Sequence, residues 1–538
     1  MPGLADDLKI RKEQFVTGLT GGTVHDVYLV TSISLITYFS YCLLNTFTQI
    51  FTSKDKKSNL NVFTVVLDYL LNWLALLLSI TTYSDNIISL IYGILIPVVT
   101  LTLTNKSSPS SSSSSSKNHT KRDGRPNIST IDKKKFLPKI SYLTVYRSQM
   151  LVITSIAILA VDFQIFPRRF AKCETWGTSL MDLGVGSFVF SMGIVSARSS
   201  IWSKFNQKKN LSFTYELTGL VKKILFSFKD SFTVFCLGIG RLFLVKLLSY
   251  QEHVSEYGVH WNFFVTLSLL QPCKYILEFV FSMLRLNNFN VLIGLAISLA
   301  YEYLLKKDDN SYLQYLLDEE RVTIFDQNKE GISSMIGYIS IFLVGESIGG
   351  FLLPSIVTPF NLIKNSTQSE IEDFYSTKNK HSKLYLWIRS QLSRSSDGCL
   401  IIYTVFFDIL ALYCQSTSVF TQVSRRFANF QYVIFVIAYN LNFLVGFKLI
   451  NKLFAYFNSE KKDANQNSYN HVPYSLEAIN NNGLLFFLIS NVSTGLVNMN
   501  INTLDASSLV GITTMIGYTL AINAVAEIFH YFKIYIKL

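Results

Sequence analysis

Long runs of apolar residues recur along the chain and are separated by shorter polar segments. Each run is long enough for a helix to cross the hydrocarbon core of a bilayer, which takes about 20 mostly apolar residues. The runs do not alternate apolar and polar positions, as the strands of a membrane β-barrel do. The pattern predicts an all-α fold, a polytopic integral membrane protein with about thirteen transmembrane helices. These spans are expected at 27–49, 60–82, 86–104, 144–162, 179–197, 230–249, 260–281, 288–306, 332–353, 398–415, 431–450, 483–500 and 507–531.

The distribution of basic residues orients these spans in the membrane. Lysine and arginine are more than twice as frequent in the segments after odd-numbered spans as on the opposite side. Because the basic side of a membrane protein faces the cytosol, the N-terminus is predicted to be lumenal and the C-terminus cytosolic. The spans at 230–249 and 260–281 are the weakest predictions, since the first contains Arg241 and Lys246 and the second also contains charges.

The composition changes this picture little. Of the 538 residues, 49% are hydrophobic and only 16% are charged, against about 25% in an ordinary soluble domain. The net charge of +12 is mainly explained by the orientation of the spans, and the basic residues are not interleaved with aromatic ones as in many nucleic-acid-binding proteins. Nucleic acid is therefore not an expected partner. We expect residues 1–538 to form a single transmembrane domain, with the Ser/Lys-rich segment 105–140 as a disordered cytosolic loop.

Polar residues are concentrated in a few segments, and an ionisable residue in or next to a span is a candidate for function because its burial in lipid is unfavourable. The densest segment runs from Ala160 to Gly186 and connects spans 4 and 5. Its basic residues lie on the predicted lumenal side, against the orientation rule, so we expect them to bind an anionic ligand or to pair with carboxylates. The candidate residues in this segment are Asp162, Arg168, Arg169, Lys172, Glu174, Trp176 and Asp182.

A second polar segment, Tyr250 to Phe264, lies on the same side between spans 6 and 7. Its ionisable residues are suited to acid–base chemistry, or they belong to a solvated interfacial loop. The candidates are Glu252, His253, Glu256 and His260. The histidine spacing does not form an H-E-x-x-H motif, and the six cysteines have no metal-ligand spacing, so we predict no metal site and no disulfide framework.

Two further segments share this polar character. Arg425 and Arg426 begin an Arg-Arg-Phe-Ala sequence that repeats the one at 168–171, which is consistent with two anion-binding turns or with chance. Asn491 and Asn498 belong to a run that is too polar to face lipid, and they are expected to form hydrogen bonds between helices or to contact a substrate. These patterns alone do not separate an enzyme from a carrier.

Several of these segments also resemble, in the same order, a known protein family. They are RKEQFVTGLTGG, LNWLALLLSITTY, the block at 160–198, EYGVHWNFF, EGISSMIGY, SRRFANFQY, NGLLFFLISNVSTGLVNMN and the C-terminal IYIKL. Together they resemble the inositol acyltransferases of glycosylphosphatidylinositol (GPI) anchor biosynthesis, the PIG-W family, particularly its fungal members. The resemblance covers nearly the whole chain, and the loop at 105–140 departs from the family's shorter loop.

This resemblance implies a multi-pass membrane protein of the endoplasmic reticulum with thirteen spans. The implied activity is transfer of a long acyl chain, typically palmitoyl, from acyl-CoA to the inositol of glucosaminyl-phosphatidylinositol. The expected partners are these two substrates and membrane lipids; acyl-CoA is a co-substrate, and no bound cofactor is expected. A glycolipid carrier or flippase and a small-anion transporter remain as alternatives.

The catalytic pair that the resemblance implies is Asp162 and Lys172. Asp162 would accept the proton of the inositol hydroxyl, and Lys172 would stabilise the oxyanion. We favour direct transfer over a thioester on Cys173. His253 and His260 are reserve bases in this hypothesis, and the two arginines of the first segment are candidates for binding phosphate.

Overall fold

The computed structural model describes residues 11–12, 14–48, 62–104, 132–206, 213–247, 254–284, 290–376, 382–460 and 472–536. Within these ranges the chain is helical, and its extended pairing is limited to isolated bridges from Gly21 and Gly22 to Thr178. The all-α prediction is confirmed. Of the predicted loop at 105–140, residues 105–131 lie outside the described residues, and residues 132–140 include a short helix with Phe136 buried.

In the described part of the chain, eleven helical stretches are long and apolar enough to cross a membrane. The protein is therefore a multi-pass membrane protein. The second stretch contains a π-helical turn, η1, between two α-helices. The helices of the eleven stretches are α2 (Val24–Phe47), α3 (Val62–Tyr69) with η1 (Leu70–Leu74) and α4 (Ala75–Ile80), α5 (Ile87–Thr104), α7 (Ser141–Ala160), α8 (Leu180–Phe205), α11 (Phe263–Met283), α14 (Lys329–Leu352), α17 (Ser396–Ser416), α18 (Phe430–Glu460), α20 (Gly483–Asn500) and α21 (Ser508–Tyr531).

The two remaining predicted spans, 230–249 and 288–306, fall on helices that carry more charge. The first contains Arg241 and the second contains Glu302 and Lys306. By length and composition these helices are not among the eleven, so the count of thirteen and the orientation of the termini stay predictions. The other helices are α6 (Lys133–Phe136), η3 (Arg168–Phe170), α9 (Phe213–Leu247), α10 (Val254–Tyr257), α12 (Asn290–Asp318, with non-helical residues at Lys307–Asn310), α13 (Ile324–Gln327), α15 (Gln368–Tyr375), α16 (Lys383–Leu392) and α19 (Tyr474–Asn481).

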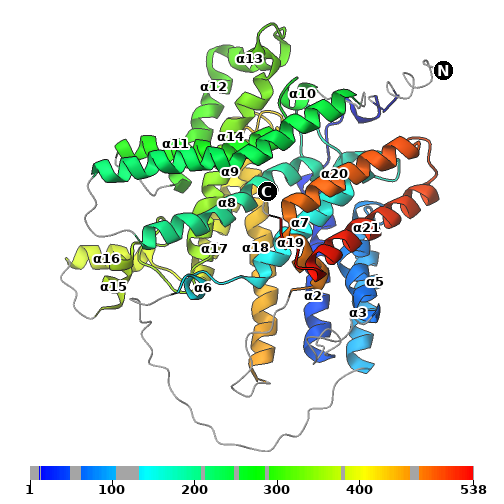
Figure 1. Cartoon of the computed structure of the whole chain (residues 1–538), viewed down its shortest axis with the longest axis horizontal. Helices are drawn as coiled ribbons and strands as arrows, with labels where there is room; N and C mark the ends of the chain where they lie inside the picture. Colours follow the sequence, from blue (N-terminus) through cyan, green and yellow to red (C-terminus); the bar gives the residue numbers. More distant parts are fainter. Residues whose placement is uncertain are drawn as a thin grey trace, which may run out of the picture.

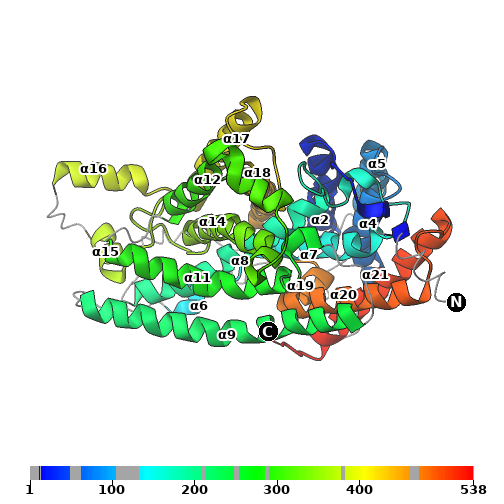
Figure 2. The ribbon, with the colours of Figure 1, turned by 90° about the horizontal axis from the view of Figure 1, so that it is seen from above.

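Helix α14 forms the centre of one half of the bundle, packed against α8, α11, α12 and α18. It is the most buried of the eleven stretches, with 83% of its apolar window inside the protein. Helices α2, α4, α5 and α7 form a second group, and α18 contacts both groups (Figure 1). Helices α19, α20 and α21 pack beside α7, as the view from above also shows (Figure 2). The bundle therefore has two halves, joined along α18 and by the contact of α7 with α8.

The charges that weakened the prediction of the span at 260–281 are paired inside the bundle. Lys274 of α11 is almost fully buried, and its Nζ lies 2.7 Å from Glu346 Oε1 of α14 and 3.3 Å from Glu278 Oε1 one turn further along α11. A charge in an apolar interior is tolerated only when it is paired. The pairing explains why this apolar helix contains a lysine.

Small residues bring α8 and α14 into close contact. Gly345 and Gly349 lie one turn apart on α14, and a Cβ atom at either would lie 2.5 Å from a carbonyl oxygen of α8. A Cβ atom at Gly193 of α8 would lie 2.4 Å from the carbonyl oxygen of Phe342. Packing of this kind replaces the hydrophobic effect as a force between helices in lipid.

The polar segments predicted on the lumenal side meet at one end of the bundle. Glu174 Oε2 accepts a hydrogen bond from the Gly18 amide (2.6 Å), and the Gly177 amide donates to the Val423 carbonyl (2.8 Å). The N-terminal segment, the connection after α7 and the segment before α18 are thus joined.

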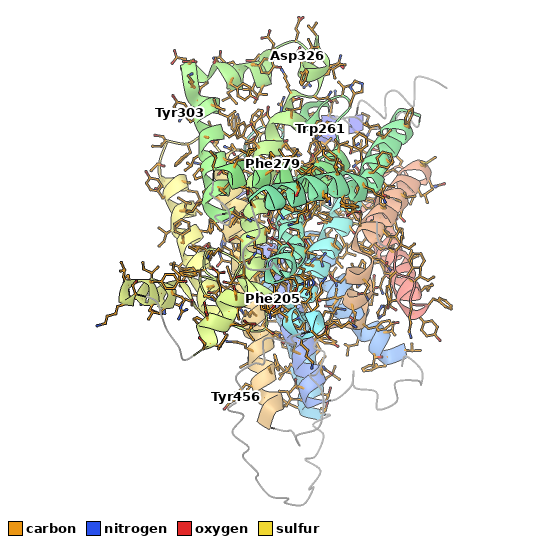
Figure 3. All side chains as sticks on the ribbon, turned by 60° about the vertical axis from the view of Figure 1, so that its left-hand side comes forward. Phe205, Trp261, Phe279, Tyr303, Asp326 and Tyr456 are labelled. Carbon is orange, nitrogen blue, oxygen red and sulfur yellow. The ribbon has the colours of Figure 1, made fainter. Side chains whose placement is uncertain are left out.

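In Figure 3, Asp326 lies at one end of the molecule and Tyr456 near the opposite end.

Replacing Gly345 with leucine should destabilise the protein by about 1–3 kcal/mol, because the new side chain overlaps the α8 backbone and forces the helices apart. Thermal unfolding of the purified protein in detergent measures the loss. Gly93→Leu in α5 is the matched control, since a Cβ atom at Gly93 meets nothing within 4 Å. Equal stability of both variants would contradict the close contact between α8 and α14.

Candidate active site

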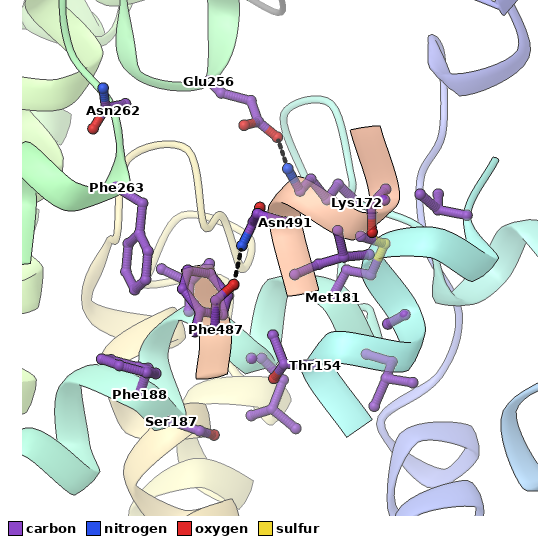
Figure 4. A pocket seen from close by; sticks show the side chains of 18 of the residues that line it. Thr154, Lys172, Met181, Ser187, Phe188, Glu256, Asn262, Phe263, Phe487 and Asn491 are labelled. Atoms are coloured by element: carbon purple, nitrogen blue, oxygen red, sulfur yellow. Dashed lines mark hydrogen bonds and ion pairs between the residues drawn. The ribbon is translucent and has the colours of Figure 1, made fainter. Parts of the chain in front are cut away.

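A cavity of about 910 Å³ lies between the two halves of the bundle, next to the end where the polar segments meet. Its walls come from α2 and the segment before it, from α7, α8, α9, α11, α18 and α20, and from the residues around α10. Its acidic and basic side chains, apart from Arg241 on α9, lie at one end, where Figure 4 shows Lys172 beside Glu256. They are Asp162, Lys172, Glu174 and Glu256. Both residues of the predicted catalytic pair therefore line one cavity.

Asp162 lies in the turn that follows α7, two residues after the helix ends. Asn498 of α20 donates a hydrogen bond from Nδ2 to Asp162 Oδ2 at 2.7 Å. Burial raises the pKa of the Asp162 carboxyl, although the Asn498 hydrogen bond and nearby basic side chains act in the opposite direction. The raised pKa makes this carboxylate a stronger base than an exposed one.

Arg168 holds the turn around Asp162 in place. Its Nη2 donates to the carbonyl oxygens of Val161 (2.9 Å) and Phe163 (3.1 Å), and its Nε and Nη2 donate to that of Phe166. These bonds tie together the backbone of the turn that follows α7. The geometry gives Arg168 a positioning role, and its predicted contact with a substrate anion stays a prediction.

Lys172 belongs to a chain of alternating charges. Its Nζ lies 2.8 Å from Glu256 Oε1, and Arg425 Nη2 lies 3.3 Å from the same carboxylate oxygen. Arg425 Nε lies 2.7 Å from Asp182 Oδ1, and both of these side chains are 2% exposed. Lys172 is 43% exposed, so the chain runs from the protein interior to the cavity.

Asp182 anchors the buried end of this chain. Besides Arg425, its carboxylate accepts hydrogen bonds from the Cys173 amide (2.9 Å) and from Ser179 Oγ (2.7 Å). Ser179 also caps the N-terminus of α8 by accepting a bond from the Asp182 amide. The Tyr432 hydroxyl donates to the Asp182 carbonyl at 2.8 Å. One carboxylate therefore fixes the connection after α7, the start of α8 and the segment before α18.

The rest of the cavity is mostly apolar. Phe188, Phe263 and Phe487 form a cluster with ring centroids 5.6–6.2 Å apart, contributed by α8, α11 and α20 (Figure 4). Along α7, the lining residues extend from Tyr146 to Asp162 at the polar end. At 1.5 Å per helical residue this is about 24 Å, most of the ~30 Å hydrocarbon core of a bilayer. The cavity has room for a long acyl chain with its head at the polar end.

Several predicted site residues have structural partners. Arg169 Nη2 lies 2.5 Å from Asp85 Oδ1, and Arg426 Nη2 lies 2.9 Å from Glu330 Oε1. The ring of Trp176 packs on that of Phe427. Glu174 lines the cavity and also holds the N-terminal segment. Arg169 and Arg426, which lie against the orientation rule in the predicted topology, are thus each paired with a carboxylate.

The remaining predicted residues lie differently with respect to the cavity. Asn491 lines it and donates from Nδ2 to the Phe487 carbonyl at 2.7 Å. His260 is exposed and does not line the cavity. Glu252 and His253 lie outside the described residues. Among the residues that the structure does describe, no group of three His, Cys, Asp or Glu side chains is placed to hold a metal ion.

Sequence reasoning missed the apolar part of the site. Phe188, Phe263 and Phe487 are unremarkable in spans that are rich in phenylalanine, and no local signal distinguishes them. Glu256 was considered only together with its histidine neighbours, although it is the residue that holds Lys172. Arg241, noted as an unfavourable residue within a span, also lines the cavity. The charge of Arg241 within a predicted span is the one feature of the sequence that indicated the α9 side of the cavity.

Comparisons with known proteins agree with the resemblance of the sequence segments. A family model described as GWT1 matches residues 8–529. The chain is 43% identical to GPI-anchored wall transfer protein 1 of Saccharomyces cerevisiae, covering 99% of both chains. It is 42% identical to the protein of the same name in Candida glabrata, again covering 99% of both. For the Candida albicans protein the identity is 40%, covering 99% of this chain and 100% of the relative.

Replacing Arg425 with glutamine should destabilise the protein by about 3 kcal/mol or more, because it leaves a buried carboxylate without its cation. Thermal unfolding in detergent measures the effect. Arg11→Gln removes an arginine of an exposed ion pair with Asp505 and should change stability by no more than about 0.5 kcal/mol. The double variant Arg425→Gln/Asp182→Asn should recover part of the loss. If the single variant is as stable as wild type, the charge chain does not organise this end of the protein.

Proposed function

The chain belongs to the GWT1 family, which implies a role in GPI-anchor biosynthesis, and on this premise we propose that it transfers a long acyl chain from acyl-CoA to an inositol hydroxyl of glucosaminyl-phosphatidylinositol. The observation that carries the proposal is the cavity, which joins a carboxylate and an ammonium group to a long apolar space. Such a cavity suits one reactant with a polar head and an acyl chain. We place the reaction at the membrane of the endoplasmic reticulum, where the family's pathway implies it.

In the proposed reaction, Asp162 acts as the general base. It takes the proton of the inositol hydroxyl as the hydroxyl oxygen attacks the thioester carbonyl carbon. The new C–O bond forms and the C–S bond breaks, and the sulfur of CoA leaves with the proton that Asp162 accepted. The raised pKa of Asp162 supports this role, because the protonated carboxyl is then a competent acid for the second step.

Lys172 stabilises the negative charge that develops on the carbonyl oxygen during attack. A positioned cation at this point is among the largest contributions to acyl transfer. Glu256 holds the Lys172 ammonium at 2.8 Å, and Arg425 competes for the same carboxylate oxygen. Glu256 carries one negative charge and pairs with both Lys172 and Arg425, so it neutralises the Lys172 ammonium only in part. The remaining positive charge stabilises the oxyanion.

We favour direct transfer without an acyl-enzyme intermediate. Cys173 lines the cavity beside Lys172, but burial and the neighbouring Asp182 raise the pKa of its thiol well above the ordinary value. The thiolate is the nucleophilic form of cysteine, and a raised pKa makes it scarce at neutral pH. The inositol hydroxyl, activated by Asp162, is the better nucleophile in this site.

Asp162→Asn and Lys172→Met should each lower the acylation rate at least about 100-fold, since each removes a group that acts in the transition state. The assay combines purified protein, palmitoyl-CoA and glucosaminyl-phosphatidylinositol, and mass spectrometry detects the acylated lipid. Asp505→Asn, an exposed carboxylate outside the cavity, is the control and should retain activity. Full activity of the two cavity variants would refute the assignment. A wild-type protein that binds the glycolipid but makes no acylated product would instead favour a carrier or flippase.

The pH dependence of the reaction should follow the pKa of Asp162. Because the base works only when deprotonated and burial raises its pKa, kcat/KM should fall with decreasing pH at a higher pH than an ordinary carboxylate would cause. Asn498→Ala removes a hydrogen bond that lowers this pKa, so the acid limb should move to still higher pH. Asn502→Ala removes a similar bond to the exposed Asp505 and should leave the limb in place. An unchanged limb in the Asn498 variant would exclude Asp162 as the titrating base.

A further inference from the structure

The cavity has a side opening between α9 and α20, which lie along the same edge of the molecule (Figure 2). Three residues of α9 and three of α20 line the cavity and are also exposed on the outer surface. They are Cys236, Gly240 and Arg241 on α9, and Val492, Leu496 and Met499 on α20. A residue that does both borders an opening. The cavity is thus connected to the lateral surface of the bundle.

Two glycines keep this opening free. Gly240 on α9 and Gly495 on α20 both line the cavity, and a Cβ atom built at either position meets no heavy atom within 4 Å. The outer surface beside them is apolar, since Phe235, Ile239 and Phe243 of α9 are exposed. An exposed apolar surface on a membrane protein faces lipid. The opening therefore leads into the bilayer rather than into water.

Arg241 introduces a positive charge at this opening. Its guanidinium lies 6.0 Å from the centre of the Phe264 ring, and in the described part of the chain it has no carboxylate partner. The residue lies six positions before the end of α9, about 9 Å along the helix axis. An arginine within an apolar helix is a candidate for function, and the planar guanidinium is suited to phosphate, which it binds through paired hydrogen bonds.

We propose that the opening between α9 and α20 is the lateral entrance for the lipid acceptor, and that Arg241 binds the acceptor's phosphodiester. The sugar headgroup then reaches the polar end of the cavity at Asp162 and Lys172, while the two acyl tails extend through the opening into the membrane. The proposal rests on the proposed function in that it takes the acceptor to be an inositol phospholipid.

The chemistry of the opening favours the acceptor over the acyl donor. A diacyl phospholipid diffuses within the bilayer and presents one phosphodiester at headgroup depth, which matches a single arginine beside an apolar gap. Acyl-CoA has one tail and a large, multiply charged, water-soluble head. Among the described residues of α9 and α20 that line the cavity, Arg241 is the basic one, so the described part of the opening offers that head a single cation. Use of the opening by the donor is an outcome that the experiments can detect.

The first experiment separates the two substrates by steady-state kinetics. Arg241→Gln should raise KM for the lipid acceptor at least about ten-fold, because a charge-assisted contact with phosphate is lost. KM for acyl-CoA and kcat should stay within about two-fold of wild type, because the reacting groups are unchanged. Lys229→Gln is the matched control, since Lys229 is an exposed basic residue of α9 that does not line the cavity. An unchanged acceptor KM, or a raised KM for acyl-CoA alone, would overturn the proposal.

The second experiment closes the opening. Gly240→Trp should reduce the rate with the membrane-embedded acceptor by about ten-fold or more, because the indole fills the gap through which the tails pass. Gly219→Trp places the same side chain on α9 at a position that also has open space but does not line the cavity. Its rate should match wild type. Equal rates in both variants would show that the acceptor does not use this opening.

The third experiment does not depend on turnover. Cys236 borders the opening and is the exposed cysteine among the free cysteines that the structure describes. In nanodiscs, phosphatidylinositol that carries a photoactivatable diazirine should label the α9 peptide containing Cys236 about three-fold or more above the corresponding phosphatidylcholine, and Arg241→Gln should abolish the difference. Preferential labelling that persists in the variant, or that is absent in wild type, would count against the phosphate contact. If the wild-type protein makes no acylated product at all, the proposed function fails, and this labelling still decides whether an anionic lipid occupies the opening.

Discussion

A chain of alternating charges, from Lys172 through Glu256 and Arg425 to Asp182, holds the polar end of the cavity together. Its members come from three segments that are far apart in the sequence. Arg425 and Asp182 are almost fully buried, and charges in such surroundings are stable only when paired and hydrogen-bonded. Movement of any one segment would leave a charge of another without its partner. The chain therefore makes the connection after α7, the short helix α10 and the segment before α18 behave as one body, and it keeps Lys172 at the cavity where Asp162 also lies.

This arrangement meets two opposing requirements, one from the acyl-transfer reaction and one from the apolar membrane. Acyl transfer to a hydroxyl requires a base and a cation near a long apolar chain, whereas a charge beside lipid is unfavourable. The protein separates the two requirements along one cavity, with ionisable groups at the end where polar segments meet and phenylalanines from α8, α11 and α20 below them. The buried pair Asp182–Arg425 holds the polar end of the cavity from inside the protein. Lys172, the exposed member of the chain, is therefore held in place without further charged partners among the described residues of the cavity.

The sequence allowed the helical bundle, most of its spans and the gathering of polar segments at one end to be predicted, because these depend on apolar run length and on the high free energy of charge in lipid. It did not reveal which polar residue bonds to which. The expectation for Arg168, an anionic ligand or a paired carboxylate, stays a prediction, and no sequence signal indicated that its Nε and Nη2 hold three backbone carbonyls around Asp162. Nothing in the sequence distinguishes Glu256 from the ionisable residues next to it. Its role depends on contacts with Lys172 and Arg425, which are distant in the sequence and are brought to it by folding. The cluster of Phe188, Phe263 and Phe487 could not be predicted from the sequence either. Only the packing of the folded helices decides which of the many phenylalanines line the cavity.

Residues that weaken a span prediction carry the most information about function here. Lys274 and Arg241 are both unfavourable within apolar helices, yet the structure treats them differently. Lys274 is buried and paired with Glu346, so its charge is accounted for within the bundle. Arg241 is exposed at an opening of the cavity, with an aromatic ring beside it and no carboxylate partner among the described residues. A bundle that needed only stability would have placed an apolar residue at that position of α9. On the proposal above, this arginine has a binding role, because it meets the phosphate of the incoming lipid acceptor.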